Sequence, residues 1–247
     1  MRYFVAFSYF GEPYHGWQKQ PNAITVQEVL ETAFSTLLRE TIVLMGAGRT
    51  DAGVHAKQMY AHFNFEQSVV VDDLVYKLNA FLPEAIAVHG IYKVPQDAHA
   101  RFNASARTYE YWVTTAKNPF YTTTAYYVKY PLDVALMNKA AEIIASYTDF
   151  ECFSKSNTDV NTYLCTITKV EWEVKEDRLV FTITANRFLR NMVRAIVGTL
   201  LDVGTGRSTL ENVMKIIESK NRSEAGKSVP AKGLYLTKIA YPSHIKL

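Results

Sequence analysis

Three clusters of residues in this sequence have types and spacings that could do chemistry. The first is GAGRTDAGVHA, Gly46–Ala56, in which Asp51 stands between Gly48 and Gly53 and two residues after Arg49. A carboxylate on a glycine-rich turn can act as a nucleophile or a base if it stays ionised, and a nearby guanidinium favours the charged form. The alternative is an Asx turn, in which the aspartate binds only its own backbone. The residues alone leave both alternatives open.

The second cluster is RFLRNMVRAIVGTLL, which predicts a helix starting near Phe188. At 100° per residue Arg187, Arg190 and Arg194 fall in one narrow sector, and the apolar residues cover the opposite side. Like charges four residues apart repel each other, so an anionic partner such as a carboxylate or a phosphate would stabilise this face. The alternative is a basic face that is simply solvated.

The third cluster is ARFNASARTYEYWV, a segment that combines basic and aromatic residues. Tyr109 and Tyr111 lie on one face of the predicted strand, and Arg101 and Arg107 precede them. Aromatic rings beside arginines can stack an unpaired base and hold its backbone. Aromatic residues in strands are also usual core residues, so each tyrosine has a packing interpretation as well.

Composition limits what kind of protein can carry these clusters. The chain has 247 residues with 48% hydrophobic content, enough for one large domain or two modest ones. The formal charge is only +3, so affinity for a polyanion must come from local groups of Lys and Arg. Cys152 and Cys165 have no metal-binding or redox spacing and suggest reduced thiols in a cytoplasmic protein.

Several common sites and segments are not indicated. GKS at Gly226–Ser228 lacks the earlier glycine of a phosphate-binding loop, and the histidines have no metal-ligand spacing, so we expect no metal. The longest apolar stretch, Phe188–Leu201, is interrupted by Arg190 and Arg194, so we expect no membrane span. The amino-terminal residues predict a strand rather than a signal peptide.

The elements that must position the clusters follow from periodicity and capping signals. The first half predicts strand 2–9, a helix opened by the capping box at Thr25–Glu28, strands 41–45 and 58–65, helix 72–80 and strand 86–94. The second half predicts strand 108–115, helix 133–147, a hairpin 166–185 turning at Glu176 and Asp177, the helix from Phe188, a helix opened by a capping box at Ser208–Glu211, and strand 234–241.

The order of these elements predicts an α+β fold with two ferredoxin-like β-α-β-β-α-β halves. Their antiparallel-rich mixed sheets would flank a central cleft. We expect residues 1–106 to form the half that carries Asp51, and residues 107–247 the half that carries Tyr109 and Arg194.

Five motifs, in order along the chain, resemble the signatures of the tRNA pseudouridine synthase A (TruA) family. They are YHGWQ at Tyr14–Gln18, GRTDAGVHA, ARFNASARTYEY, FLRNMVRAIVG and PAKGLYL at Pro230–Leu236. One local difference is that Arg190 and Asn191 stand where the family often has histidines, a difference that concerns substrate contacts. The resemblance extends over almost the whole chain.

The resemblance implies an isomerase that needs no cofactor, because the freed uracil is its own reaction partner. Asp51 would be the catalytic aspartate, attacking the sugar or abstracting its proton so that the bond between uracil N1 and the ribose breaks and C5 is rejoined. Tyr109 would stack on the target base or assist proton removal, and Arg194 would pair with Asp51. Arg49 would lie near the extruded nucleotide, and Leu234 would line the pocket.

The partner implied is tRNA, modified at positions 38 to 40 of the anticodon stem-loop by a homodimeric, cytoplasmic enzyme. A base in a helical stem must be flipped out before a carboxylate reaches its sugar, and phosphate contacts must offset that cost. The candidates for those contacts are Arg101, Arg107, Arg187, Arg190, Lys227 and Lys232.

Two other classes of protein stay possible. A non-catalytic RNA-binding module could use the same sheet and aromatic residues, although the sequence lacks the RNP1 pattern of such modules. A hydrolase of sugars would need a second carboxylate opposite the first, and near Tyr109 the sequence offers only Glu110, on the other strand face.

Overall fold

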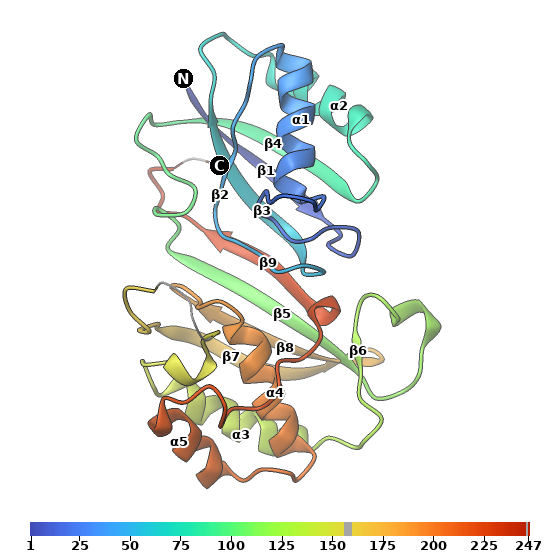
Figure 1. Ribbon diagram of the computed structural model, residues 1–247, viewed down its shortest axis with the longest axis vertical. Coiled ribbons are helices and arrows are strands. Elements are labelled where there is room, and N and C mark those ends of the chain that lie inside the picture. Colours follow the sequence, from blue (N-terminus) through green and yellow to red (C-terminus); the bar gives the residue numbers. More distant parts are fainter. Residues whose placement is uncertain (156–159, 246) are drawn as a thin grey trace. The chain divides into compact units, whose positions relative to one another are not determined.

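The computed structural model describes residues 1–155, 160–245 and 247 and divides the chain into two compact units. Unit 1 contains Met1–Ser105 and Tyr235–Leu247, and unit 2 contains Ala106–Leu234. Each unit combines strands with helices, so the fold is α+β, as predicted (Figure 1). The division into domains 1–106 and 107–247 that we expect from the sequence stays a prediction. In the structure, the chain after Leu234 packs with unit 1.

Unit 1 has the predicted β-α-β-β-α-β order. Its elements are β1 (Arg2–Tyr9), α1 (Val26–Leu38), β2 (Met45–Gly46), β3 (His55–Asn64), α2 (Val71–Phe81) and β4 (Ile86–Val94), followed by β9 (Leu234–Ala240). Strand β1 pairs antiparallel with β3 on one side and with β4 on the other, and β2 pairs antiparallel with β3. The order β4-β1-β3-β2 is that of a ferredoxin-like sheet. Strand β9 runs parallel to the start of β3.

The two helices of unit 1 lie side by side (Figure 1). Helix α1 begins where predicted, because the Thr25 hydroxyl accepts a hydrogen bond from the backbone N–H of Glu28 at 3.4 Å. Helix α2 is fixed to β4 by Asn79, whose side-chain amide donates to the carbonyl of Val88 and accepts from its N–H, both at 2.8 Å. The apolar helix faces are buried with the strands as one core.

The strand predicted at 41–45 is wrong in extent, since only Met45–Gly46 pair as β2. The preceding residues are bound instead to side chains of α1. The Ser35 hydroxyl accepts from the N–H of Ile42 at 2.9 Å, and the Glu31 carboxylate accepts from the N–H of Leu44 at 3.0 Å. These side chains replace the ladder that a longer strand would need.

Unit 2 contains mainly antiparallel strands together with three helices. Its strands are β5 (Ala106–Thr114), β6 (Tyr126–Tyr127), β7 (Ile167–Lys175) and β8 (Arg178–Ala185), its helices α3 (Val134–Ala145), α4 (Met192–Gly204) and α5 (Leu210–Ser219), and its 3-10 turns η1 (Pro119–Tyr121), η2 (Glu151–Phe153) and η3 (Ala231–Gly233). The order is β5-β8-β7, and the β7–β8 hairpin turns at Glu176 and Asp177 as predicted. Asn138 of α3 holds the backbone of Trp172 in β7 as Asn79 holds Val88 in unit 1.

Two predicted helix starts in unit 2 are wrong. Helix α4 begins at Met192 rather than near Phe188, because Asn191 has a left-handed backbone (φ 67°) that interrupts the helix. Arg187 and Arg190 therefore precede the helix and do not form one helical face with Arg194. Helix α5 is capped by Thr209, one residue later than the capping box predicts.

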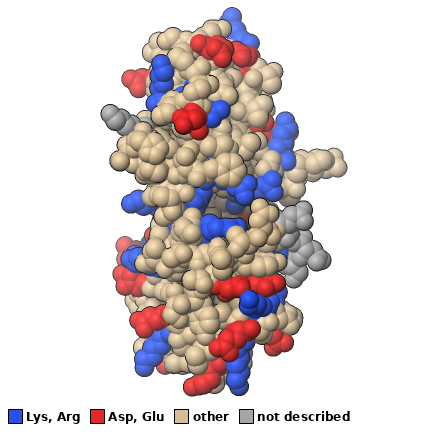
Figure 2. Space-filling view, turned by 90° about the vertical axis from the view of Figure 1, so that its left-hand side faces the viewer, with Lys and Arg blue, Asp and Glu red and all other residues tan. Residues whose placement is uncertain are grey.

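The surface carries charges of both signs. In the view of Figure 2, Lys and Arg side chains and Asp and Glu side chains both occur across the face shown, consistent with the small net charge of +3.

Among the described residues, every helix is too short or too polar to cross a bilayer.

Candidate active site

Asp51 lies on the loop that joins β2 to β3 in unit 1. The N–H of Ala47 donates to the carbonyl of Tyr60 at 2.8 Å, and the N–H of Val54 donates to the carbonyl of Asp51 at 3.2 Å. Asp51 is half-buried, whereas Val54 is buried. The loop is therefore fixed at both ends with its aspartate near the surface.

The YHGWQ segment braces this loop from the other side. The N–H of Trp17 donates to the carbonyl of Thr50 at 3.2 Å, and the N–H of Gly53 donates to the carbonyl of Tyr14 at 3.3 Å. The Tyr9 hydroxyl bonds the Thr50 hydroxyl at 2.8 Å. Sequence reasoning assigned no site residue in this segment, and the signal that marks it is the glycine between His15 and Trp17.

This glycine, Gly16, is required by its backbone conformation and by its close approach to the loop. Its φ is +85°, and a Cβ there would overlap the carbonyl oxygen of Thr50 and lie 3.1 Å from the carbonyl carbon of Asp51. Only a residue without a side chain can pass so close to the backbone of the loop.

His55, the histidine of the loop motif, is a packing residue. It is buried, and its Nδ1 accepts a hydrogen bond from the N–H of Gly11 at 2.9 Å. The rings of Phe10 and Tyr235 stack on its two sides, with centroids at 4.5 and 4.6 Å. This arrangement fixes the end of the loop.

Arg49 is exposed, and its Nε donates to the side-chain carbonyl of Gln18 at 3.2 Å. Arg101 is exposed as well, with its guanidinium 5.6 Å from the centroid of the Phe102 ring. Arg101 follows β4, whose end pairs with the start of β1, whereas Asp51 precedes β3 at the opposite end of the sheet. Arg49, which is on the loop of Asp51, and Arg101 therefore lie at opposite ends of the strands of unit 1.

In unit 2, the two tyrosines of β5 have different surroundings. Tyr111 is fully buried, and its hydroxyl donates to the carbonyl of Pro230 at 2.7 Å. Tyr109 is half-buried, with its ring edge-on to that of Phe188 at 5.1 Å. Burial raises the pKa of the Tyr111 phenol, so this group remains a donor. Of the two tyrosines, Tyr109 is the one that is partly exposed.

Arg194 projects from the first turns of α4 and is held by the segment that follows α5. Its Nε donates to the carbonyl of Val229 at 2.7 Å, and the N–H of Val229 donates to the carbonyl of Arg194 at 3.2 Å. Arg222 binds this segment in turn, donating to Ser228 Oγ at 2.7 Å and to the carbonyl of Gly226 at 3.2 Å. The guanidinium of Arg194 is thus oriented by backbone that is itself fixed.

The other predicted site residues of unit 2 have different surroundings. The guanidinium of Arg107 donates to the carbonyl of Asn186 at 3.0 Å, and that of Arg187 donates to the carbonyl of Thr162 at 3.1 Å. Arg190 is exposed, and Leu234 is buried. The two guanidinium groups thus bind different backbone carbonyls, and the helical stripe that the sequence predicts is not formed.

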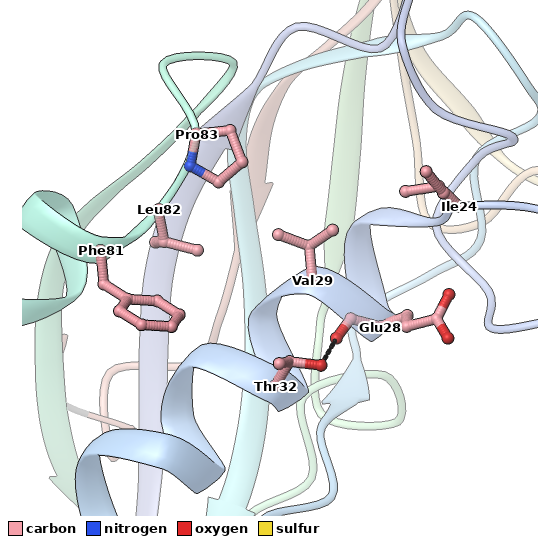
Figure 3. A pocket seen from close by; sticks show the side chains of 7 residues that line it. All are labelled: Ile24, Glu28, Val29, Thr32, Phe81, Leu82 and Pro83. Carbon is pink, nitrogen blue, oxygen red and sulfur yellow. Dashed lines mark hydrogen bonds between the residues drawn. The ribbon is translucent and has the colours of Figure 1, made fainter.

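An apolar groove of about 450 Å³ lies between α1 and α2 in unit 1 (Figure 3). Its lining residues are Ile24, Glu28, Val29, Thr32, Phe81, Leu82 and Pro83. The lining carries a carboxylate and contains none of the predicted site residues, so the groove is unsuited to a polyanion.

A ferredoxin-like α+β fold with a carboxylate on a braced glycine-rich loop, and with arginines on both units, fits an enzyme that acts on a nucleic acid. Comparison with known proteins identifies the family. A family model described as tRNA pseudouridine synthase matches residues 5–103 and 147–242. The chain belongs to this family.

Relatives similar over nearly the full length support the same conclusion. A protein of Bacteroides fragilis named tRNA pseudouridine synthase A is 50% identical over 99% of this chain and 98% of its own. One of Bacteroides thetaiotaomicron with the same name is 51% identical over 99% of this chain and 92% of its own. One of Acetivibrio thermocellus, again so named, is 41% identical over 96% and 98%.

Proposed function

We propose that this chain is an isomerase that converts uridine to pseudouridine in tRNA, at one or more of positions 38, 39 and 40 of the anticodon stem-loop. The family and the full-length similarity to relatives named tRNA pseudouridine synthase A support this activity. The observation that carries the catalytic assignment is the fixed loop of Asp51, braced by Trp17 and Tyr14. Because the proposed substrate is tRNA, we also propose that the enzyme acts in the cytoplasm.

In the proposed reaction Asp51 initiates cleavage of the bond between N1 of uracil and C1′ of the ribose. It either attacks the sugar or abstracts a ribose proton. The uracil then rotates and C5 bonds to C1′, while the bond between Asp51 and C1′ breaks or the abstracted proton returns to the ribose. C5 then loses its proton and N1 gains one. Product and substrate are isomers, so the reaction consumes no cofactor. A carboxylate suits either first step only when it is ionised and held in place.

The remaining predicted residues have roles toward the same nucleotide. Tyr109 stacks on the target base or assists proton removal, and Arg194 pairs with the catalytic carboxylate. Arg49 lies near the extruded nucleotide, and Leu234 lines the base pocket. The basic residues named above contact phosphates, offsetting the few kcal/mol that flipping a base costs. We further propose that the enzyme is a homodimer that holds tRNA across both subunits.

Replacing Asp51 by Asn tests the proposal. Wild-type enzyme incubated with unmodified tRNA transcripts should form pseudouridine at positions 38 to 40, detected by mapping at single-nucleotide resolution. Asp51→Asn should bind tRNA within a few-fold of wild type and form none. Asp97→Asn, a change of the same type at an exposed position after β4, should retain activity.

Other outcomes would refute the proposal or favour one of the two rival classes of protein. Conversion by Asp51→Asn would refute the role of this carboxylate, and product confined to another arm of the tRNA would refute the substrate assignment. Release of free uracil would favour a hydrolase. Binding without conversion by the wild type would favour a non-catalytic RNA-binding protein.

A further inference from the structure

A chain of side-chain hydrogen bonds connects Arg49 on the catalytic loop to a carboxylate on α1. Arg49 Nε donates to Gln18 Oε1 at 3.2 Å, and Gln18 Nε2 donates to Gln27 Oε1 at 3.1 Å. Gln27 Nε2 donates to Glu31 Oε1 at 3.0 Å. Four side chains from three segments thus form one continuous path, which we call the amide relay.

The two ends of the amide relay determine its direction. A guanidinium only donates hydrogen bonds and a carboxylate only accepts them, whereas an amide can do either. Gln27 must therefore turn its NH2 group toward Glu31, where it also reaches the carbonyl of Leu44 at 3.0 Å. Its oxygen then accepts from Gln18 and from the N–H of Lys19 at 2.9 Å. Gln18 is left with one orientation, its oxygen toward the arginine.

The inner end of the relay is rigid and its outer end is exposed. Gln27 is 9% exposed, and the Glu31 side chain, one helical turn later, is 13% exposed. Glu31 is fixed further by the N–H of Leu44 at 3.0 Å. Gln18 and Arg49 are at the surface. Within the part of the chain that the structure describes, Arg49 makes its hydrogen bond through Nε, which leaves its terminal NH2 groups to a ligand.

We propose that Gln18 and Gln27 are positioning residues that aim the guanidinium of Arg49 at the target nucleotide. This inference rests on the proposed function, because that function places Arg49 beside the extruded nucleotide. An arginine side chain loses much rotational freedom when it binds a partner, and a relay that orders it beforehand reduces that loss. The relay should therefore act on the step in which the nucleotide is flipped and held.

The test is Gln18→Met, which keeps the size of the side chain and removes both hydrogen bonds. Loss of the bond that orients Arg49 should lower kcat on a tRNA transcript about fivefold. KM should change less than about twofold, because phosphate contacts elsewhere hold the tRNA. Because Gln18 is exposed, the unfolding midpoint should not move. Gln67→Met, an exposed glutamine in another loop of unit 1, is the matched control and should behave as wild type.

A double mutant separates positioning from a direct contact of Gln18 with tRNA. In an Arg49→Met background, Gln18→Met should have no further effect. Gln27→Glu should lower kcat in the same way, because it replaces the NH2 donor by a carboxylate oxygen facing Glu31 and the carbonyl of Leu44. The repulsion should displace the side chain to which Gln18 donates. An unchanged kcat for Gln18→Met, or the same fivefold loss without Arg49, would overturn the inference.

A second readout does not depend on catalysis. In nitrogen-15 NMR spectra the Nε–H proton of Arg49 should exchange slowly with water in the wild type and rapidly in Gln18→Met. Equal exchange in both would refute the relay. If the wild type forms no pseudouridine, the proposed function fails, and the Nε–H signal still decides whether the relay orders Arg49.

Discussion

The backbone N–H of Trp17 donates a hydrogen bond to the carbonyl oxygen of Thr50 at 3.2 Å, one residue before the proposed catalytic aspartate. The loop around Asp51 has little regular secondary structure, so its conformation depends on such contacts. A catalytic group displaced by about 1 Å can lose about 100-fold in rate. The amino-terminal segment therefore supports the proposed active site, although it carries no group that we assign to the chemistry.

Gly16→Ala should disrupt this contact. The new Cβ would overlap the carbonyl of Thr50, and φ is +85°, so either the loop or the YHGWQ segment must move. We expect pseudouridine formation to fall by about 100-fold and the free energy of unfolding to fall by more than about 2 kcal/mol. Denaturant titration and single-turnover kinetics measure both.

Gly206→Ala is the control for backbone strain alone. Gly206 has a φ of +74°, and a Cβ there would meet no atom within 4 Å. It should cost about 1–2 kcal/mol of stability and leave the rate of the folded enzyme unchanged. An equal loss of rate in both variants would show that the overlap with Thr50 is not responsible.

Tyr109→Phe and Tyr111→Phe should differ in their effect on stability. Tyr111 donates from the core to the carbonyl of Pro230, so its change should cost about 1–2 kcal/mol of stability and leave most of the activity. Tyr109 is half-buried, so its change should leave stability nearly intact. If Tyr109 assists proton removal, kcat falls; if it only stacks, kcat is retained. Thermal unfolding and kcat distinguish these results, and a strongly destabilised Tyr109→Phe would contradict the assignment.

Arg194→Lys should lower kcat by at least about tenfold, because an ammonium cannot reproduce the planar guanidinium that Val229 holds through Nε. Arg207→Lys is the matched control. Arg207 makes a surface ion pair with Asp202 at 2.7 Å, and exposed pairs contribute little to stability. Full activity in Arg194→Lys would show that a positive charge is sufficient at this position.

Stability should decrease as the pH falls from 7.5 to 5, because His62 is buried as the neutral ring. Burial, helped by His99 and Arg2, lowers the pKa of His62 to about 4 from its ordinary value of 6.5. Its Nδ1 accepts from the N–H of Ala100 at 3.2 Å, which a protonated ring could not do. Between these pKa values the unfolded chain binds more protons, so unfolding is favoured by about 1–2 kcal/mol at pH 5.

His62→Gln removes the titrating group and retains an acceptor for Ala100. The free energy of unfolding, measured with urea at each pH, should vary less in this variant than in the wild type. A wild-type curve that is flat over this range, or a variant with an unchanged slope, would contradict the prediction. Carboxyl groups with a lowered pKa, such as Asp149, titrate mainly below this range.

Sequence patterns predicted most elements where the signal was local. Strands β1 and β4 have the predicted bounds, and α1 is capped by Thr25 as expected. The errors occurred where side-chain hydrogen bonds or an unusual backbone conformation replaced the structure that the residue types favour. Side chains of α1 took the hydrogen bonds that a strand at 41–45 would have used. The left-handed backbone of Asn191 delayed α4 and removed the predicted arginine stripe.

The sequence by itself determined the family resemblance, the α+β class and the candidates Asp51, Tyr109 and Arg194, because motifs and periodicity are properties of residues close together in the chain. Only the tertiary structure showed that Gly16 and Trp17 brace the loop of Asp51, that Tyr111 is a core residue, and that Gln18 links Arg49 to Glu31. Those contacts join residues far apart in sequence, and no periodicity records which backbone groups will meet once the chain is folded.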